Sequence, residues 1–236
     1  MFVPPIDAVR NSLFFAIMTV ALALVLGISA AYSLTHSTLR KFQSTILNSA
    51  PRNAAQILFQ GALQNLRKVR GLDALYMLPL GTSAVTLGFG FLIALDQPPL
   101  ELRTTVYLVP IAHALVAFPF VVRSLLPILR GIKPQLKEAA RVLGASPLRV
   151  WREIDVPIIT RAIIVGAVFA FVISLGEFGA TALIVLPEYP TLPIAIFRLL
   201  GQPGIANYGQ AMALSVILMV VSALAIFAME RVRIGE

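Results

Sequence analysis

Long apolar stretches with almost no formal charge alternate with short polar and basic segments along this chain of 236 residues. The hydrocarbon core of a bilayer is about 30 Å thick, so a helix rising about 1.5 Å per residue needs roughly 20 apolar residues to cross it. The pattern therefore predicts an all-α membrane protein with about five transmembrane helices. The five predicted spans are residues 11–34, 74–95, 104–122, 162–186 and 209–229.

The composition agrees with a membrane protein and excludes several kinds of site. Apolar residues make up 58% of the chain and charged residues 13%, whereas a soluble domain averages about half apolar and a quarter charged. The chain has no cysteine, so it contains no disulfide, thiolate zinc site or iron–sulfur cluster. Its two histidines, His36 and His113, are too few and too far apart for a histidine-rich metal centre. We therefore expect no cofactor in this chain.

The basic residues are distributed unevenly between the two sides of the predicted membrane topology. The segment 35–72 holds six Lys or Arg, the segment 123–161 holds eight and the C-terminal tail holds two, which makes sixteen of nineteen. Basic residues collect in cytoplasmic loops, so this count predicts an outer N-terminus and a cytoplasmic C-terminus. The topology accounts for the net charge of +8, and no nucleic acid partner is needed.

Two shorter segments have a helical pattern but lack the length to cross a bilayer. Residues 192–200 are apolar and lie between prolines and Gly201, which indicates a short re-entrant or interfacial helix. Residues 53–67 place apolar side chains on one helical face and basic side chains at the end, as in an amphipathic helix lying on lipid headgroups.

The predicted cytoplasmic segment 123–161 contains two short helices with a break between them. Pro134 opens the first helix and Gly144 ends it, since proline suits a first turn and glycine a C-terminus. Pro147 starts the second helix, and Pro157 is expected to end it before the fourth span. Such a pair fits a docking surface for a partner, and it equally fits an interfacial helix pair resting on lipid.

This segment also carries a fixed series of residue types: Glu138-Ala139-Ala140, three residues, Gly144, nine residues, then Ile154-Asp155-Val156-Pro157. The series resembles a loop of a known family. In permease subunits of bacterial and archaeal ABC importers, the EAA loop reads E-A-A, three residues, G, nine residues, then I-x-L-P. Only Val156 departs from that pattern, as a conservative replacement of leucine. The resemblance implies the type I ABC importer permease fold in the cell membrane of a bacterium or archaeon. The matching residues are Glu138, Ala139, Ala140, Gly144, Ile154 and Pro157.

The resemblance also implies a role and a set of partners for this loop. In the family it forms a coupling helix that sits in a groove on the ATP-hydrolysing subunit, so all six matching residues are expected to contribute to that coupling. The expected partners are an ATP-binding ABC subunit, a second permease subunit or half, an extracytoplasmic solute-binding protein and membrane lipid. The chain has no phosphate-binding loop, so ATP hydrolysis is expected on a separate subunit and not in this chain.

A second stretch, Ser174 to Gly179 followed by Thr191 to Pro193, resembles the C-terminal end of thiamine and ferric iron permeases. Molybdate and sulfate permeases carry a similar G-E-F-G signature. The resemblance therefore implies an importer for thiamine or ferric iron first, with molybdate, tungstate or sulfate as the alternative. An intramembrane enzyme or a membrane assembly factor remains a rival of another class. The enzyme reading lacks a second catalytic candidate beside Ser174 and Glu177.

Within this stretch, Glu177 is expected slightly past the middle of the span 162–186. An ionisable side chain there costs roughly 2.5–3.5 kcal/mol on insertion scales and usually faces a cavity or a partner. We therefore expect Ser174, Glu177 and Phe178 to lie along the substrate pathway or gate, with a helix–helix hydrogen bond as the plain alternative. His113, in the middle of the third span, is expected to be a packed and hydrogen-bonded histidine.

The resemblance covers residues 10–232, so we expect a single permease transmembrane domain over residues 1–236. Permeases of the thiamine and iron type are usually tandem fusions with about six spans in each half. This chain resembles a second half without its first span. It is then a fragment, a sequence with a misplaced start, or a separate five-span subunit.

Overall fold

The computed structural model describes residues 4–48, 74–96 and 101–234, and these residues form helices joined by turns, without a strand among them. The predicted amphipathic helix at 53–67 lies outside the described residues. The helices are α1 (Pro5–Asn48), an unlabelled helix (Ala74–Gly81), α3 (Ala84–Ala94), α4 (Leu108–Gly131), α5 (Pro134–Val142), α6 (Pro147–Val150), the π-helix η1 (Trp151–Asp155), α7 (Val156–Gly176), α8 (Thr181–Ile184), α9 (Leu192–Leu200) and α10 (Ile205–Ile234).

The described helices confirm an all-α membrane fold. Four of them are long and apolar enough to cross a bilayer, or five if one bent pair forms a single span. The nine-residue helix α9 coincides with the short helix expected at 192–200. The four candidate spans are Pro5–Thr35, Leu108–Gly131, Pro147–Gly176 and Ile205–Arg231.

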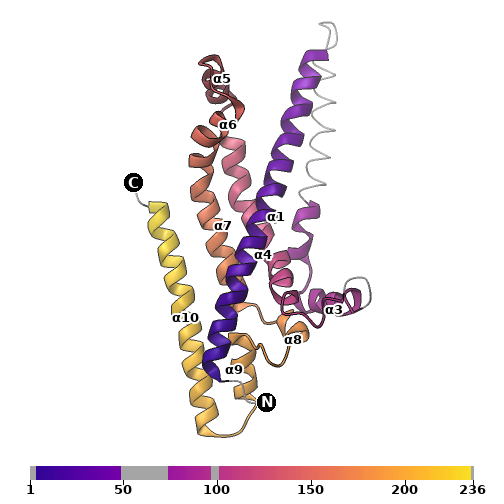
Figure 1. Ribbon diagram of the computed structural model, residues 1–236, viewed down its shortest axis with the longest axis vertical. Helices are drawn as coiled ribbons and strands as arrows, with labels where there is room; N and C mark the ends of the chain where they lie inside the picture. The colour runs from indigo at the N-terminus through magenta and orange to yellow at the C-terminus, as the bar shows by residue number, and fades with distance from the viewer. Residues whose placement is uncertain (1–3, 49–73, 97–100, 235–236) are drawn as a thin grey trace.

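The helices α1, α4 and α7 pack against one another and hold the larger apolar core (Figure 1). Glycines allow their close approach. A Cβ atom on Gly27 of α1 would lie 2.5 Å from Val121 Cγ1 of α4, and one on Gly166 of α7 would lie 3.3 Å from Val121 Cα. Small residues at such contacts let membrane helices pack backbone to backbone. Buried residues of this core include Ala23, Ala30, Ala117, Leu125, Ile159 and Ala170.

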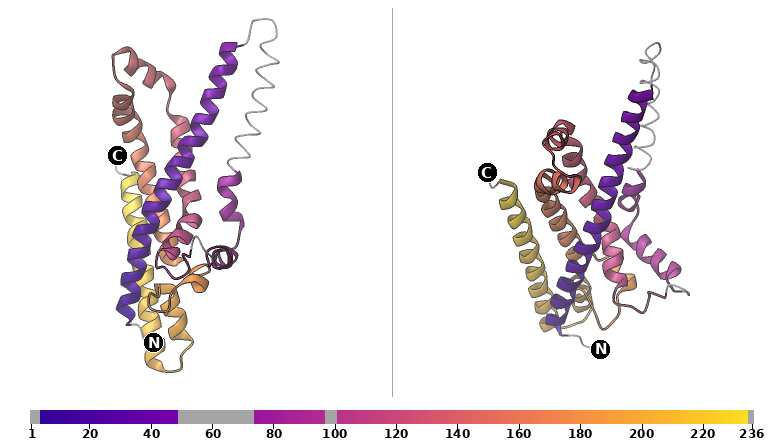
Figure 2. Two further views of the ribbon diagram at one scale, coloured as in Figure 1. Left: turned by 45° about the vertical axis from the view of Figure 1, so that its right-hand side comes forward. Right: turned by 45° about the horizontal axis from the view of Figure 1, so that its top comes forward.

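The segment expected to form a span at 74–95 is not one continuous helix. Two helices occupy these residues, and they meet at an angle of 101°. Thr82 and Ser83 separate them, and Ser83 has an extended backbone with φ −67° and ψ 136°. The second helix, α3, packs against α8, where a Cβ on Gly88 would lie 2.8 Å from Ala180 Cα. This contact fixes α3 across the bundle (Figure 2).

The fourth span also differs from its predicted bounds of 162–186. Its helix begins at Pro147, runs through Pro157 and ends at Gly176. Pro157 therefore does not end a helix. The turn before it, η1, is a π-helix in which the Val156 N–H bonds to the Trp151 carbonyl. Such a widened turn accommodates the missing N–H and the ring of a proline, because the regular i to i−4 pattern is already interrupted.

The lower end in Figure 1 is tied together by polar contacts from α1. Asn11 Nδ2 donates to the Pro190 carbonyl at 3.3 Å, and Ser12 Oγ accepts from the Leu192 N–H at 2.7 Å. These contacts hold the segment that enters α9. Helix α10 then returns along the outside of the bundle, where it packs on α9 and α7 (Figure 2).

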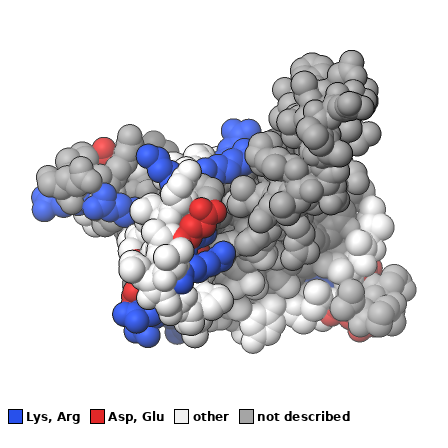
Figure 3. Space-filling model, turned by 90° about the horizontal axis from the view of Figure 1, so that it is seen from above, with Lys and Arg blue, Asp and Glu red and all other residues white. Residues whose placement is uncertain are grey.

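The opposite end of the molecule, which carries α5 and α6, is basic. Figure 3 looks down on this end and shows Lys and Arg side chains around it. By contrast, Arg10 lies near the start of α1 and Arg198 lies in α9, at the other end of the bundle. Most exposed basic residues thus lie at the end that was expected to face the cytoplasm. The orientation itself stays a prediction. Exposed basic residues of the segment include Lys133, Arg141, Arg149 and Arg152.

Candidate functional site

The turn after α5 has the backbone geometry that the glycine position requires. Gly144 has φ +84°, a backbone conformation that is energetically unfavourable for any residue with a Cβ atom. The Ala145 N–H bonds to the Ala140 carbonyl at 3.0 Å, and the Gly144 N–H bonds to the Arg141 carbonyl at 2.9 Å. This pair of bonds is a Schellman motif, which satisfies the last carbonyls of a helix. The sequence therefore ends α5 sharply and turns the chain towards α6.

The segment from α5 to α6 presents apolar side chains to solvent. Val142 and Leu143 are 88% and 87% exposed, and Leu136 and Leu148 are also exposed. A contiguous exposed apolar surface typically marks an interaction site. We call these four residues, with Glu138 and Ala139, the docking face. It projects from the end of the molecule beyond α7 (Figure 1).

The six residues matched to the EAA pattern fall on consecutive elements near this end. Glu138 and Ala139 are exposed on α5, and Ala140 beside them is half-buried. Gly144 forms the turn just described. Ile154 lies half-buried in η1, and Pro157 lies exposed at the second position of α7. The structure thus brings the first four into one exposed helix and turn, while the last two belong to the helix that enters the bundle.

Three side-chain contacts connect η1 to other elements. Lys137 Nζ of α5 lies 2.7 Å from Asp155 Oδ1, at the last residue of η1. Trp151 Nε1, at the first residue of η1, donates to Tyr32 Oη of α1 at 3.2 Å. A third pair, Arg149 with Glu153, is an exposed i,i+4 ion pair at 2.9 Å. The π-helical turn therefore has side-chain contacts with both α5 and α1.

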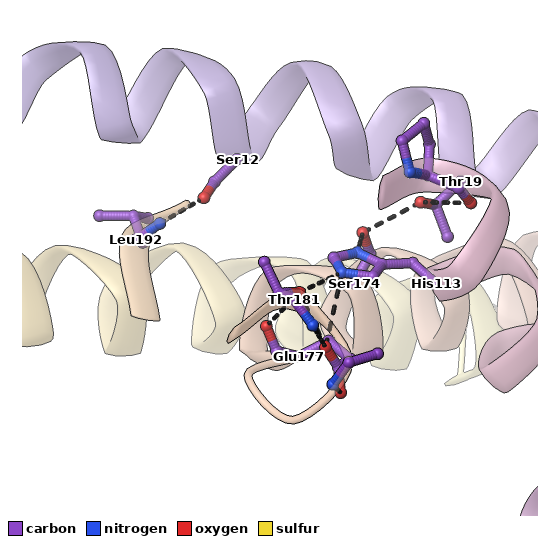
Figure 4. Close-up of polar contacts among 9 residues, drawn as sticks. Ser12, Thr19, His113, Ser174, Glu177, Thr181 and Leu192 are labelled. Carbon is purple, nitrogen blue, oxygen red and sulfur yellow. Dashed lines mark hydrogen bonds and ion pairs between the residues drawn. The ribbon is translucent and has the colours of Figure 1, made fainter. Parts of the chain in front are cut away.

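A buried polar network lies deeper in the molecule, where α1, α4, α7 and α8 meet (Figure 4). His113 Nδ1 lies 2.8 Å from Ser174 Oγ, and His113 Nε2 lies 2.6 Å from Thr181 Oγ1. Ser174 Oγ in turn contacts Thr19 Oγ1 at 3.1 Å. His113 is completely buried, which confirms the packed, hydrogen-bonded histidine expected from the sequence. Both ring nitrogens have hydroxyl partners. Because the Thr181 hydroxyl donates its one proton to Glu177 Oε2, it can only accept from His113, which favours the neutral tautomer with its proton on Nε2.

Glu177 completes this network, but not from inside a membrane helix. It follows the last residue of α7 with an extended backbone, so its predicted place within a span is wrong. Its Oε1 accepts from the Ala180 N–H at 3.1 Å, and its Oε2 accepts from the N–H and hydroxyl of Thr181 at 3.1 and 2.8 Å. His113 Nε2 lies 3.6 Å from the same Oε2. The buried carboxylate therefore holds the backbone of the loop that leads into α8.

Phe178 is the partly exposed member of the predicted pathway residues. Its ring is tilted against the ring of Phe197 on α9, with centroids 5.3 Å apart. Ser174, by contrast, is buried on α7 and points into the network. The three residues are neighbours in space, yet only Phe178 offers a substantial surface, with 38% of it exposed.

Sequence reasoning missed two members of the network, Thr19 and Thr181. Thr181 lies four residues after Glu177, and its hydroxyl reaches back to that carboxylate across the turn that leads into α8. That spacing could have identified it. Thr19 is an isolated hydroxyl in an apolar span, and its contact with Ser174 joins residues 155 positions apart. No local pattern indicates such a contact.

A separate cavity of about 710 Å³ lies between α4, α7 and α10. Its walls are mainly apolar and include no member of the polar network. Among the described residues, no group of three or more His, Asp or Glu side chains is placed to hold a metal ion. Lining residues of the cavity are Ser124, Ile128, Pro157, Arg161, Phe169 and Met229.

Curated relatives of this chain are transport permeases. A putative 2-aminoethylphosphonate transport system permease protein of Salmonella paratyphi A is 30% identical over 167 residues, which cover 70% of this chain and 62% of the relative. The molybdenum transport system permease protein of Escherichia coli is 44% identical over 97 residues, covering 40% of this chain and 42% of the relative. A sulfate transport system permease protein of Salmonella typhimurium is 34% identical over 119 residues, covering 48% and 43%.

The chain spans at most about 62% of the length of these relatives. A family model described as "Binding-protein-dependent transport system inner membrane component" matches residues 69–233. This match includes the docking face, η1 and the buried network except for its contribution from α1. It covers well over half of the chain. The protein is therefore a multi-pass inner membrane protein that belongs to the family of binding-protein-dependent transport system inner membrane components.

Proposed function

We propose that this chain is a permease subunit of an ATP-driven importer, which moves a small solute delivered by an extracytoplasmic binding protein. The observation that carries the proposal is the docking face, a helix and turn with the EAA spacing that exposes Val142 and Leu143 beyond the bundle. Membership of the family agrees with it. The chain itself is proposed to be a transport subunit, with ATP hydrolysis on a separate partner.

The proposed mechanism follows from the position of the docking face. An ATP-binding subunit would cover Leu143 and its neighbours, and would move α5 when two such subunits close on ATP. Because η1 and α7 continue from α6 as one helix, displacement of the docking face would reach the bundle as a rigid-body motion. Alternating access would result when two permeases rock against each other.

A second permease subunit or half is part of the proposal. Helix α10 exposes many apolar side chains, and only 6% of its most apolar window is buried within this chain. Lipid would cover part of this surface, and the second permease would cover the remainder. The proposed partner is another copy of this chain or a different permease half.

For the outer end, we propose that Ser174, Glu177 and Phe178 form a gate. Glu177 would act by holding the loop, since its oxygens accept from the Ala180 and Thr181 backbone. Ser174 would anchor the same loop through His113. Phe178 would provide the surface that moves, packed on Phe197 in the closed state.

The proposed solute is a small oxyanion or organophosphonate. The relatives described above are named for 2-aminoethylphosphonate, molybdenum and sulfate transport. They support the molybdate or sulfate alternative drawn from the G-E-F-G signature, and they give no support to the thiamine or ferric iron that the signature suggested first. Uptake of radiolabelled molybdate, sulfate and 2-aminoethylphosphonate into cells that carry the native operon would distinguish these solutes.

The docking proposal is tested by co-purification. The full chain is expressed from its native operon, solubilised in detergent and scored for recovery of an ATPase subunit. Gly144→Asp places a Cβ and a charge in the positive-φ turn directly after Leu143 of the docking face, and is expected to abolish recovery. Gly131→Asp is the matched control, because Gly131 ends α4 nearby, has open space around it and has no positive φ.

Recovery of the ATPase with wild type and the Gly131 variant, but not with the Gly144 variant, supports the proposal. A folded wild-type chain that brings down no ATPase contradicts it and favours a membrane assembly factor. If the chain were instead an intramembrane enzyme, Glu177→Gln would abolish the reaction that this enzyme catalyses and would not affect ATPase recovery.

A further inference from the structure

The docking helix α5 has few contacts with the remainder of the chain. Within the described residues its main packing neighbour is the one-turn helix α6, and the Schellman turn connects the two. The contact between Lys137 and Asp155 is different, because it runs directly from α5 to the helix that enters the bundle. It bypasses the turn at Gly144 and the whole of α6.

The two side chains of this ion pair are buried to different extents. The Asp155 side chain is 9% exposed, whereas that of Lys137 is 32% exposed, so the carboxylate lies inside and the ammonium closes over it. Among the described residues, Lys137 Nζ is the one cation within 4 Å of Asp155 Oδ1, and that oxygen accepts no hydrogen bond. A buried carboxylate is stabilised by a nearby opposite charge, so a movement of α5 that withdraws Lys137 removes the cation from Asp155 Oδ1.

The site of the contact within the helix is also informative. Asp155 is the last residue of η1, and the Val156 N–H bonds to the Trp151 carbonyl across that widened turn. Trp151 at its other end donates to Tyr32 of α1. Isolated π turns frequently occur at functional sites in helices. Here the turn is the point where contacts from α5, from α1 and into α7 meet.

We propose that the Lys137–Asp155 ion pair is a positioning contact that transmits the movement of α5 to α7. The inference rests on the proposed function, because it assumes an ATP-binding partner on the docking face. Lys137 precedes the EAA pattern and Asp155 occupies its variable position after Ile154, so the pattern specifies neither residue, and neither belongs to the proposed gate. The ion pair makes the docking helix and the start of α7 move together, while the Gly144 turn alone leaves them connected only through the backbone.

The test uses the complex of the full chain with its ATPase subunit in liposomes, and it needs no knowledge of the solute. Because the chain has no cysteine, Leu183→Cys introduces a single thiol into it, at a 38% exposed position of α8 next to the loop that Glu177 holds. Its rate of reaction with a membrane-impermeant maleimide is measured without nucleotide and after trapping with ATP and vanadate. ATP hydrolysis and the thermal midpoint of the complex are measured in parallel.

Three changes are compared in this background. Lys137→Ala with Asp155→Asn removes the contact and both charges together, so no orphaned charge remains buried. Lys137→Arg keeps the charge and the reach. Arg149→Gln with Glu153→Gln removes the exposed ion pair of the same segment, whose side chains are 67% and 59% exposed, and serves as the matched control.

The expected result is that trapping changes the labelling rate about tenfold in the parent, the Lys137→Arg variant and the control, the size of a typical coupling between sites. The double variant at 137 and 155 should retain the ATPase, hydrolyse ATP and show a change of less than about twofold. A double variant that responds like the parent overturns the inference. Parallel losses of thermal midpoint and ATPase recovery also overturn it, since they indicate a purely structural pair.

Failure of the proposed function gives a different result. In that case the parent itself recovers no ATPase, or its thiol reacts at one rate in both states. Either outcome contradicts the docking face or the gate before the ion pair is considered, and the inference falls with them.

Discussion

His113 of α4 and Ser174 of α7 meet inside the bundle, with 2.8 Å between the imidazole Nδ1 and the hydroxyl oxygen. Both side chains are buried, so neither can exchange its partner for water without opening the interface. The contact joins two helices that also enclose the larger apolar core. It therefore connects the stability of the core to the loop held by Glu177.

Replacing Ser174 with alanine should destabilise the protein by about 1–3 kcal/mol, because a buried imidazole nitrogen loses its partner. The measurement is the thermal midpoint in detergent. Ser124→Ala is the matched control, since the Ser124 hydroxyl bonds only to the Phe120 carbonyl one turn earlier in its own helix. Equal shifts for the two variants would contradict a special role for the network.

Close packing of α1 on α4 gives a second prediction. Gly27→Ala would place a Cβ 2.5 Å from Val121 Cγ1 and 2.6 Å from Val121 Cβ, so the two helices must separate. We expect a loss of stability of about 1–3 kcal/mol by overpacking. Adding Val121→Ala to the variant should restore part of this loss.

The control for this prediction is Gly90→Ala, because nothing lies within 4 Å of a Cβ at Gly90. That variant should leave the thermal midpoint unchanged or raise it slightly, since alanine favours the helix. If Gly27→Ala were equally harmless, the close approach of α1 and α4 would be wrong.

The apolar pattern predicts the helical membrane fold because length and hydropathy are what a bilayer selects. It does not predict where α7 ends. Several residues after Gly176 are also apolar. Among them, Ala180 and Ile184 pack with residues of α1 and α4 in a second core cluster. Hydropathy therefore does not change at the end of the helix. The bend between Gly81 and Ala84 is missed for the same reason, because both arms of the pair are apolar.

Some residues of the candidate sites can be found from the sequence, whereas others depend on tertiary contacts. Gly144 is found from the sequence because a helix end with positive φ has a local signature. Glu177 stands out as a charge in an apolar stretch, although its role as a cap on the α8 backbone depends on the loop. The pairing of Lys137 with Asp155 depends on how α5 folds back over η1, a tertiary relationship that no spacing rule specifies.

The cap formed by Glu177 supplies a third prediction. Glu177→Gln replaces one carboxylate oxygen with an amide group that donates, and this group would face the N–H of Ala180 or Thr181. The loop should loosen, and a thiol at Phe178→Cys should react several-fold faster with a water-soluble maleimide. Glu188→Gln, at an exposed position of the following loop, should leave the rate unchanged.

Cysteine labelling also tests the orientation that the basic residues predict. Leu143 on the docking face is 87% exposed and Ile205, the first residue of α10, is 92% exposed. Helix α5 and the start of α10 lie at opposite ends of the bundle (Figure 1). In intact cells, a membrane-impermeant maleimide should label Ile205→Cys and leave Leu143→Cys unmodified until the membrane is permeabilised. The two variants control for each other, because both thiols are accessible in detergent. Labelling of Leu143→Cys from outside would place the docking face away from cytoplasmic ATP, and no importer mechanism through that face would then be possible.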